Sequence, residues 1–157
     1  MTSRTRIGRA GRLLTVTAMV ASLLTLASTA GASNATLRSS VNSGSRTVGA
    51  DAHSIALAAS NRHPRRMTSS ALRFRSDALR ARAAVARQRP STAGGKRART
   101  LALTAFADYA AAGKGWAVTG RARLRGDRAS AGRSARAATA LARAGNKLLL
   151  AAGKLLH

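Results

Sequence analysis

The sequence contains no cysteine and no glutamate, and acidic residues of any kind are scarce. The 4 acidic residues are all aspartates and stand against 28 lysines and arginines, which leaves a formal net charge of +24. Without cysteine, the chain can form neither a disulfide scaffold nor a thiolate metal site. Because the carboxylates needed for general acid and base chemistry are nearly absent, the protein is not expected to be an enzyme.

Aromatic residues and histidines are also few. With 1 tryptophan, 1 tyrosine and 2 phenylalanines, no aromatic ladder accompanies the basic residues, so base stacking of the single-strand type is not indicated. His53, His63 and His157 are too scattered to predict a metal site, and no cofactor is expected. The group Asp51, His53 and Ser54 lies in a segment with nothing to fix its geometry, so it predicts no active site.

Most of the cations are arginines. A strongly cationic chain binds polyanions, and the planar guanidinium group suits bidentate contact with phosphate or carboxylate. Codon bias in a GC-rich genome is an alternative reason for the abundance of arginine. It does not explain the missing acidic residues, so the net charge is the firmer signal.

The first 32 residues have the organisation of a secretory signal. Four arginines in "MTSRTRIGRAGR" precede the uncharged run "LLTVTAMVASLLTLAS", and "AGA" ends at Ala32. This order predicts a signal peptide over 1–32, cleaved near Ala32, and a secreted or envelope-associated protein. A retained membrane anchor is the alternative, although the apolar run over 13–28 is shorter than the roughly 20 residues that span a bilayer.

The next segment, 33–68, is rich in Ser, Asn, Ala, Gly and Thr, with a short apolar interlude at "SIALAA". This composition is typical of a disordered linker. The motif "HPRR" near its end predicts an exposed basic turn at Pro64, with a processing site as the alternative.

From residue 69 to 157 the composition changes to Ala, Leu and Arg, which favours helices. We expect an all-α bundle of about three helices, over 70–89, 97–125 and 128–156. Ser69 or Ser70 would open the first helix, Pro90 would follow its end, and Asp127 would open the third.

The second and third expected helices carry apolar seams. One seam in the second helix is spaced alternately by three and four residues and consists of Leu103, Phe106, Ala110, Gly113, Ala117, Gly120 and Leu124. Gly113 and Gly120 would let a neighbouring backbone come close, unless "GKGW" forms a bend. The third helix has a broad apolar face that we expect to pack on the second, although Gly145 and Asn146 could split it. Opposite that face stand Arg136, Arg143, Lys147 and Lys154.

The turn between these two helices partly resembles one tetratricopeptide hairpin. The matching residues are Trp116, Gly120, Gly126, Ala131, Ala135 and Ala138. No second copy of the repeat is present, so the resemblance implies a helix–turn–helix hairpin and nothing about ligands.

The first expected helix carries Arg-x-Arg three times at intervals of seven residues. In a helix this spacing gives two stripes on nearly opposite sides, formed by Arg73, Arg80 and Arg87 and by Arg75, Arg82 and Arg89. Such a helix could bridge anionic chains in two directions. A solvated bundle helix with an accidental arginine repeat is the alternative.

Three classes of function follow. The leading hypothesis is an exported protein that binds anionic polymers without sequence specificity, such as a cell-wall polyanion, extracellular nucleic acid or acidic polysaccharide. The six arginines of the repeat and the four cations of the third helix are its candidate site. The alternatives are a membrane-surface or membrane-active amphipathic protein and a helical scaffold with no polyanion role. A helix-binding partner protein is possible under any of them, and no small-molecule substrate is expected.

Overall fold

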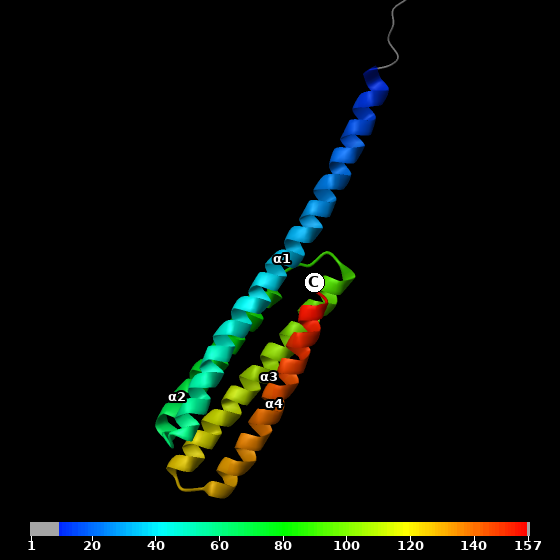
Figure 1. Cartoon of the computed structure of the whole chain (residues 1–157). Coiled ribbons are helices and arrows are strands. Elements are labelled where there is room, and N and C mark those ends of the chain that lie inside the picture. Colours follow the sequence, from blue (N-terminus) through cyan, green and yellow to red (C-terminus); the bar gives the residue numbers. More distant parts are fainter. Residues whose placement is uncertain (1–9, 157) are drawn as a thin grey trace, which may run out of the picture.

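The protein is an antiparallel bundle of helices. The computed structural model describes residues 10–156, with side chains described from Ser33 onward. This part of the chain contains four helices and no strand: α1 (Ala10–Ser60), α2 (Pro64–Ala86), α3 (Ala93–Leu124) and α4 (Arg128–Lys154). Successive helices run in opposite directions (Figure 1). The expected all-α bundle is confirmed, but the expected count of three helices is one too low.

Helix α1 replaces the expected linker. Residues 33–60 are helical, and they bury Leu37, Val41, Val48 and Ile55 in the core. The expectation of disorder over 33–68 is therefore wrong for this segment. Most of its polar side chains, with the exception of Asp51, lie outside the narrow apolar seam that packs on α2. Such a helix is stabilised by tertiary packing rather than by its composition.

Helix α2 begins at Pro64, several residues before the expected start at Ser69 or Ser70. Proline is favourable in the first helical turn because its φ angle is already helical and it has no amide hydrogen to leave unpaired. The hydroxyl group of Thr68 donates to the carbonyl oxygen of Pro64 at 2.9 Å. The "HPRR" motif is therefore the turn into α2 and its first residues.

The boundaries of α3 and α4 follow local capping chemistry. Thr92 accepts a hydrogen bond from the Gly95 amide at 3.0 Å, so α3 starts earlier than expected. Asp127 caps α4 as predicted, accepting from the Ser130 amide at 2.9 Å. Gly126 precedes it with a φ of 75°, a conformation that favours glycine. Helix α4 continues without interruption past Gly145, and α3 likewise continues through "GKGW".

The four aromatic side chains meet in the centre of the bundle. Phe74 of α2 makes edge-to-face contacts with Tyr109 and Trp116 of α3, at centroid distances of 5.8 and 5.2 Å. Phe106 lies 6.1 Å from Tyr109. Such contacts add to the burial of apolar area, so the contacts of Phe74 help to hold α2 against α3.

Two glycines of the predicted α3 seam allow this close packing. A Cβ atom at Gly113 would lie 2.9 Å from the carbonyl oxygen of Ala71, and one at Gly120 would lie 2.9 Å from that of Pro64. Both oxygens belong to the backbone of α2. The expectation that a neighbouring backbone approaches these glycines is confirmed.

The expected packing of the third helix on the second is also observed, because α4 packs along the length of α3. Its buried residues include Ala138, Gly145 and Ala152, while Leu141 and Leu155 are partly buried against the core. The aliphatic side chains nearest α3 are therefore hidden in the folded chain.

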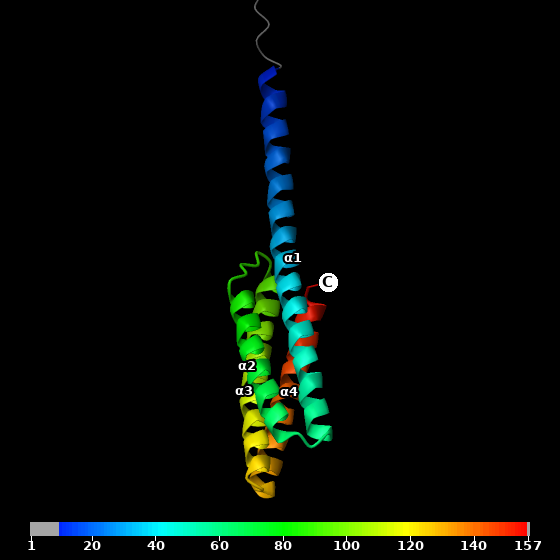
Figure 2. The same ribbon diagram turned by 90° about the vertical axis from the view of Figure 1, so that its left-hand side faces the viewer.

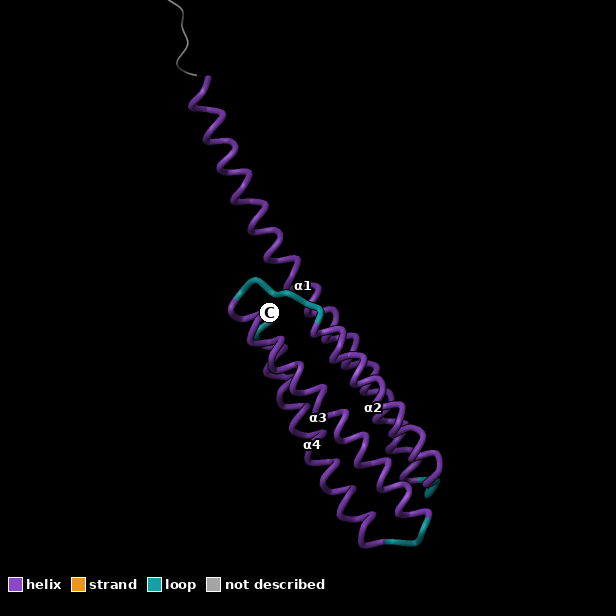
Figure 3. The backbone as a smooth tube through the Cα atoms, turned by 180° about the vertical axis from the view of Figure 1, so that it is seen from behind, coloured by secondary structure: helices purple, strands orange, loops and turns teal. Residues whose placement is uncertain are grey.

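The N-terminal part of α1 projects beyond the bundle, past the end where the α2–α3 connection and the C-terminal end of α4 lie (Figure 3). The turns that join α1 to α2 and α3 to α4 lie at the opposite end. The side chains of Ser33 and Asn34 reach Ser91 and Thr92, at 3.2 and 3.0 Å. The expected cleavage site near Ala32 thus lies directly before residues of α1 that contact the α2–α3 connection. Within the residues whose side chains are described, no helix is long and apolar enough to span a membrane.

Candidate polyanion-binding surface

The six arginines of the Arg-x-Arg repeat are all exposed. Helix α2 buries the flank that contains Phe74, Ala78 and Val85, and leaves Leu72 and Leu79 on the outside. One flank is therefore buried deeply, with the two arginine stripes along its edges. Their aliphatic stems can border the buried face while the guanidinium groups reach solvent.

The first stripe borders α1. The Nε atom of Arg73 donates to Oδ1 of Asp51 at 2.7 Å, and Arg80 and Arg87 line a hollow between the two helices. Arg66, one further interval of seven residues towards the N-terminus, lines a second hollow together with Arg73. We call these four residues, Arg66, Arg73, Arg80 and Arg87, the arginine ladder. At 1.5 Å per residue its rungs are about 10.5 Å apart along the axis of α2.

The facing wall is contributed by α1 and the turn after it. Ser40 and Thr47 line the hollow at Arg80 and Arg87, whereas Ser54 and Asn61 line the hollow at Arg66 and Arg73. These four polar residues are also spaced by seven, so they follow the same long edge of α1 in the direction opposite to the ladder. We call these two hollows together, which lie between this wall and the ladder, the α1–α2 furrow.

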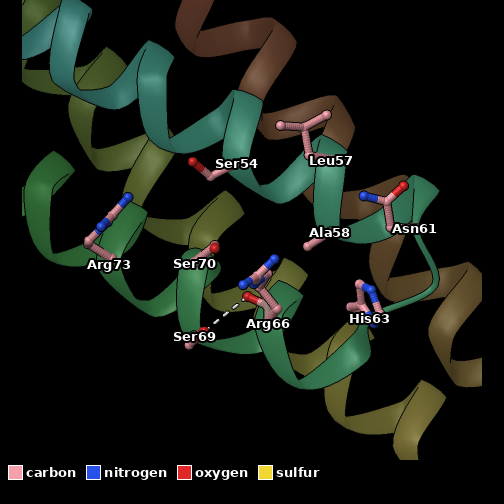
Figure 4. Close-up of a pocket in the computed structure, with 9 residues that line it drawn as sticks. All are labelled: Ser54, Leu57, Ala58, Asn61, His63, Arg66, Ser69, Ser70 and Arg73. Atoms are coloured by element: carbon pink, nitrogen blue, oxygen red, sulfur yellow. Dashed lines mark hydrogen bonds between the residues drawn. The ribbon is translucent and has the colours of Figure 1, made fainter.

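The end of the furrow near the turn is a pocket of about 490 Å³ (Figure 4). Arg66 and Arg73 reach into it from α2, with Ser70 between them and Asn61 and His63 beside the turn. The hydroxyl group of the neighbouring Ser69 already donates to the carbonyl oxygen of Arg66 at 3.0 Å. Two guanidinium groups with hydroxyl and amide donors suit a phosphate or carboxylate oxygen.

Asp51 lines neither hollow of the furrow but pairs with Arg73, which lines one of them. Asp51 is only 3% exposed, and its Oδ2 atom is buried without a hydrogen-bond partner among the described residues. Burial raises the pKa of Asp51 above its ordinary value, the Asp77 carboxyl group raises it further, and Arg73 lowers it. Asp77 itself pairs with Arg80. The furrow is therefore cationic at both ends, and its two middle arginines are partly neutralised.

The raised pKa of Asp51 predicts how stability changes with pH. The folded chain binds the proton of the Asp51 carboxyl group more tightly than the unfolded chain does. The contribution of this proton to stability is therefore complete below pH 3.8 and is lost as pH rises through the folded-state pKa. Asn resembles the protonated carboxyl group, so Asp51→Asn should be more stable than the wild type at pH 7. The difference should shrink towards pH 4 in thermal unfolding followed by circular dichroism. A difference that grows on acidification would contradict the raised pKa.

The other candidate cations lie outside the furrow. Arg75 of the second stripe approaches Gly113 and therefore lies on the α3 side of α2. The α4 set, Arg136, Arg143, Lys147 and Lys154, is exposed on the helix that packs against α3. The structure thus separates the ten candidate cations into different surfaces. Beyond these, every Lys and Arg from residue 33 to 156 is exposed except Arg99, which is half-buried.

The wall formed by α1 was missed by the sequence interpretation. Ser40, Thr47, Ser54 and Asn61 lay in the expected linker, and Arg66 lay before the expected start of the helix. Their common spacing of seven, matching that of the arginines, was the available signal. Among the described residues no cluster of His or Asp could hold a metal ion.

A scan against protein-family models, a search of curated proteins and a search of solved structures each found no match to the chain. The functional argument therefore depends on the geometry and charge of the surface alone.

Proposed function

We propose that the protein is exported and binds anionic polymers at or outside the cell envelope, without sequence specificity, along the α1–α2 furrow. The observation that supports this most directly is the arginine ladder opposite a wall of hydroxyl and amide side chains. A cell-wall polyanion, extracellular nucleic acid and acidic polysaccharide share the chemistry that such a furrow recognises. No catalytic role is proposed.

The spacing of the ladder arginines favours a linear polymer as the ligand over a single small anion. The ladder repeats about every 10.5 Å along α2, so an extended chain of phosphates or carboxylates could meet several rungs in turn. Each contact releases condensed counterions, which makes such binding strong at low salt and weak at high salt. The cations elsewhere on the surface would add long-range attraction.

The placement of the aromatic residues argues against recognition of bases. Phe74, Phe106 and Tyr109 are buried, and Trp116, which is half-buried, makes an edge-to-face contact with Phe74. None of these four side chains lines the furrow. Binding through backbone phosphates, independent of sequence, is the mode that remains for nucleic acid.

Export is supported by the position of the predicted cleavage site in the fold. The signal pattern places cleavage near Ala32, directly before Ser33 and Asn34, whose side chains contact Ser91 and Thr92 of the α2–α3 connection. Removing 1–32 would leave both sides of the furrow in place. The membrane-surface alternative has less support, because Leu141 and Leu155 of α4 pack against the core.

The test compares two triple variants of equal charge. Arg66, Arg80 and Arg87 are changed to Gln in one, and Arg75, Arg82 and Arg89 in the other; Arg73 is kept because it pairs with buried Asp51. Binding of the full chain to duplex DNA, teichoic acid and an acidic polysaccharide is measured across a salt series. The furrow variant should bind all three more weakly than its control, and on DNA its slope of log affinity against log salt should be shallower by up to about 2.7, at 0.9 per lost phosphate contact.

The possible outcomes separate the parts of the proposal. Equal losses in both variants would mean that the charge acts as a whole and the furrow has no special role. Absence of binding to any of the polymers at low salt would exclude the polyanion function itself.

A further inference from the structure

A second site lies on another side of α1, between the first and last helices. Helix α1 packs on α2 and touches α3 only slightly, while α4 packs on α3, so α1 and α4 are not in close contact. Both lie on the same side of the bundle in Figure 2. Between them is a groove of about 670 Å³, with Phe74, Tyr109 and Trp116 among its lining residues. This volume is typical of small-molecule sites.

The walls of this α1–α4 groove are made largely of small and aliphatic residues. Gly49 of α1 and Gly153 of α4 line it, and a Cβ atom added at either would meet nothing within 4 Å. Leu150 lies at its edge and is 69% exposed, the most exposed of the large hydrophobic residues among those described. Water therefore contacts an apolar channel that the bundle leaves uncovered.

The charge of the groove is confined to one end. Lys154 is its one charged lining residue, and no carboxylate lines it. The phenol group of Tyr109 donates to Oδ1 of Asn146, and burial raises its pKa, so it stays neutral. Twelve residues of α4 separate Ala142, at the far end, from Lys154, which corresponds to about 18 Å. An apolar channel with one terminal cation complements a molecule with a long tail and one anionic head.

We propose that the α1–α4 groove binds a single-chain anionic amphiphile, such as a long-chain fatty acid, with its carboxylate at Lys154 and its alkyl chain along Leu149 and Leu150 towards Trp116. The site is independent of the furrow and goes beyond polyanion binding. It also departs from the sequence-based expectation that no small molecule is bound.

Trp116 provides a direct probe because it is the only tryptophan in the chain. The full chain is titrated with a long-chain fatty acid brominated in mid-chain, below its micelle concentration, and Trp116 fluorescence is recorded. Bromine in the groove should quench this fluorescence saturably. Lys154→Gln should weaken binding about tenfold, since a hydrogen bond to a charged group contributes free energy of that order.

Gly49→Phe is the blocking variant. Its side chain enters open space, so helical circular dichroism should be unchanged while saturable quenching is lost. The variant with Arg66, Arg80 and Arg87 changed to Gln should be quenched like the wild type, which separates this site from the furrow. The uncharged methyl ester of the same fatty acid should bind about tenfold more weakly than the acid.

Four results would overturn the proposal. These are the absence of saturable quenching, equal quenching of Gly49→Phe and the wild type, and equal affinity for the acid and its methyl ester. The fourth is a dimer in sedimentation that Gly49→Phe converts to a monomer, since a second copy of the chain would then occupy the groove.

Discussion

A chain that begins at Asn61 is expected to be unfolded, whereas a chain that begins at Ser33 is expected to unfold at the same temperature as the full chain. Removing α1 exposes the α2 face around Phe74 and deletes the four largest buried aliphatic side chains of α1: Leu37, Val41, Val48 and Ile55. At about 1.5–3 kcal/mol for each buried side chain, their contribution is about 6–12 kcal/mol. This is comparable to the whole stability of a small domain, about 5–15 kcal/mol.

The chain that begins at Ser33 is the matched control. It lacks the part of α1 that projects beyond the bundle (Figure 1) but retains the contacts of Ser33 and Asn34. Thermal unfolding of the three chains, followed by far-ultraviolet circular dichroism, measures the difference. Cooperative unfolding of the chain that begins at Asn61, at the temperature of the full chain, would mean that α1 is dispensable and that the expected linker was the better description.

Helix α1 was missed although its seam is present in the sequence. Leu37, Val41, Gly44, Val48, Asp51, Ile55 and Ala58 alternate steps of four and three residues, as a packing seam does. Two of these positions hold Gly and Asp, which do not look apolar. Contacts with α2 account for both residues. A Cβ atom at Gly44 would lie 2.7 Å from the Cβ atom of Ala81, and Asp51 pairs with Arg73. Composition alone therefore favoured a linker.

The later helices were predictable because their capping residues and the spacing of their apolar residues indicate the same helices that tertiary packing stabilises. Asp127 caps α4, and the spacing of Phe106, Gly113 and Gly120 identified the face of α3 that is buried. Three residues of the arginine ladder, Arg73, Arg80 and Arg87, were predictable for the same reason, since a stripe on one helix depends only on spacing. Arg66 was missed because it lay before the expected start of that helix. The furrow needs a second helix beside it, and its position could not be derived while α1 was taken as a linker.

The seam glycines lead to the second large effect. Changing both Gly113 and Gly120 to Ala should destabilise the bundle strongly, because each added Cβ atom meets the backbone of α2, and at Gly120 it also meets the hydroxyl group of Thr68. At Gly113 the nearest atoms include the carbonyl oxygen of Ala71 at 2.9 Å, and at Gly120 the carbonyl oxygen of Pro64 at 2.9 Å. Overpacking of this kind costs about 1–3 kcal/mol at each site. Chemical denaturation should show a correspondingly lower free energy of unfolding.

Changing both Gly49 and Gly153 to Ala should have the opposite effect and raise the free energy of unfolding. Both glycines are also helical, but a Cβ atom at either meets nothing within 4 Å. Alanine there should stabilise the chain by about 0.5–1 kcal/mol per site through helix propensity. The two double variants are chemically identical, so the difference between their free energies of unfolding isolates the approach of α2 to α3. If both were stabilised equally, α2 and α3 would have to lie further apart than the structure places them.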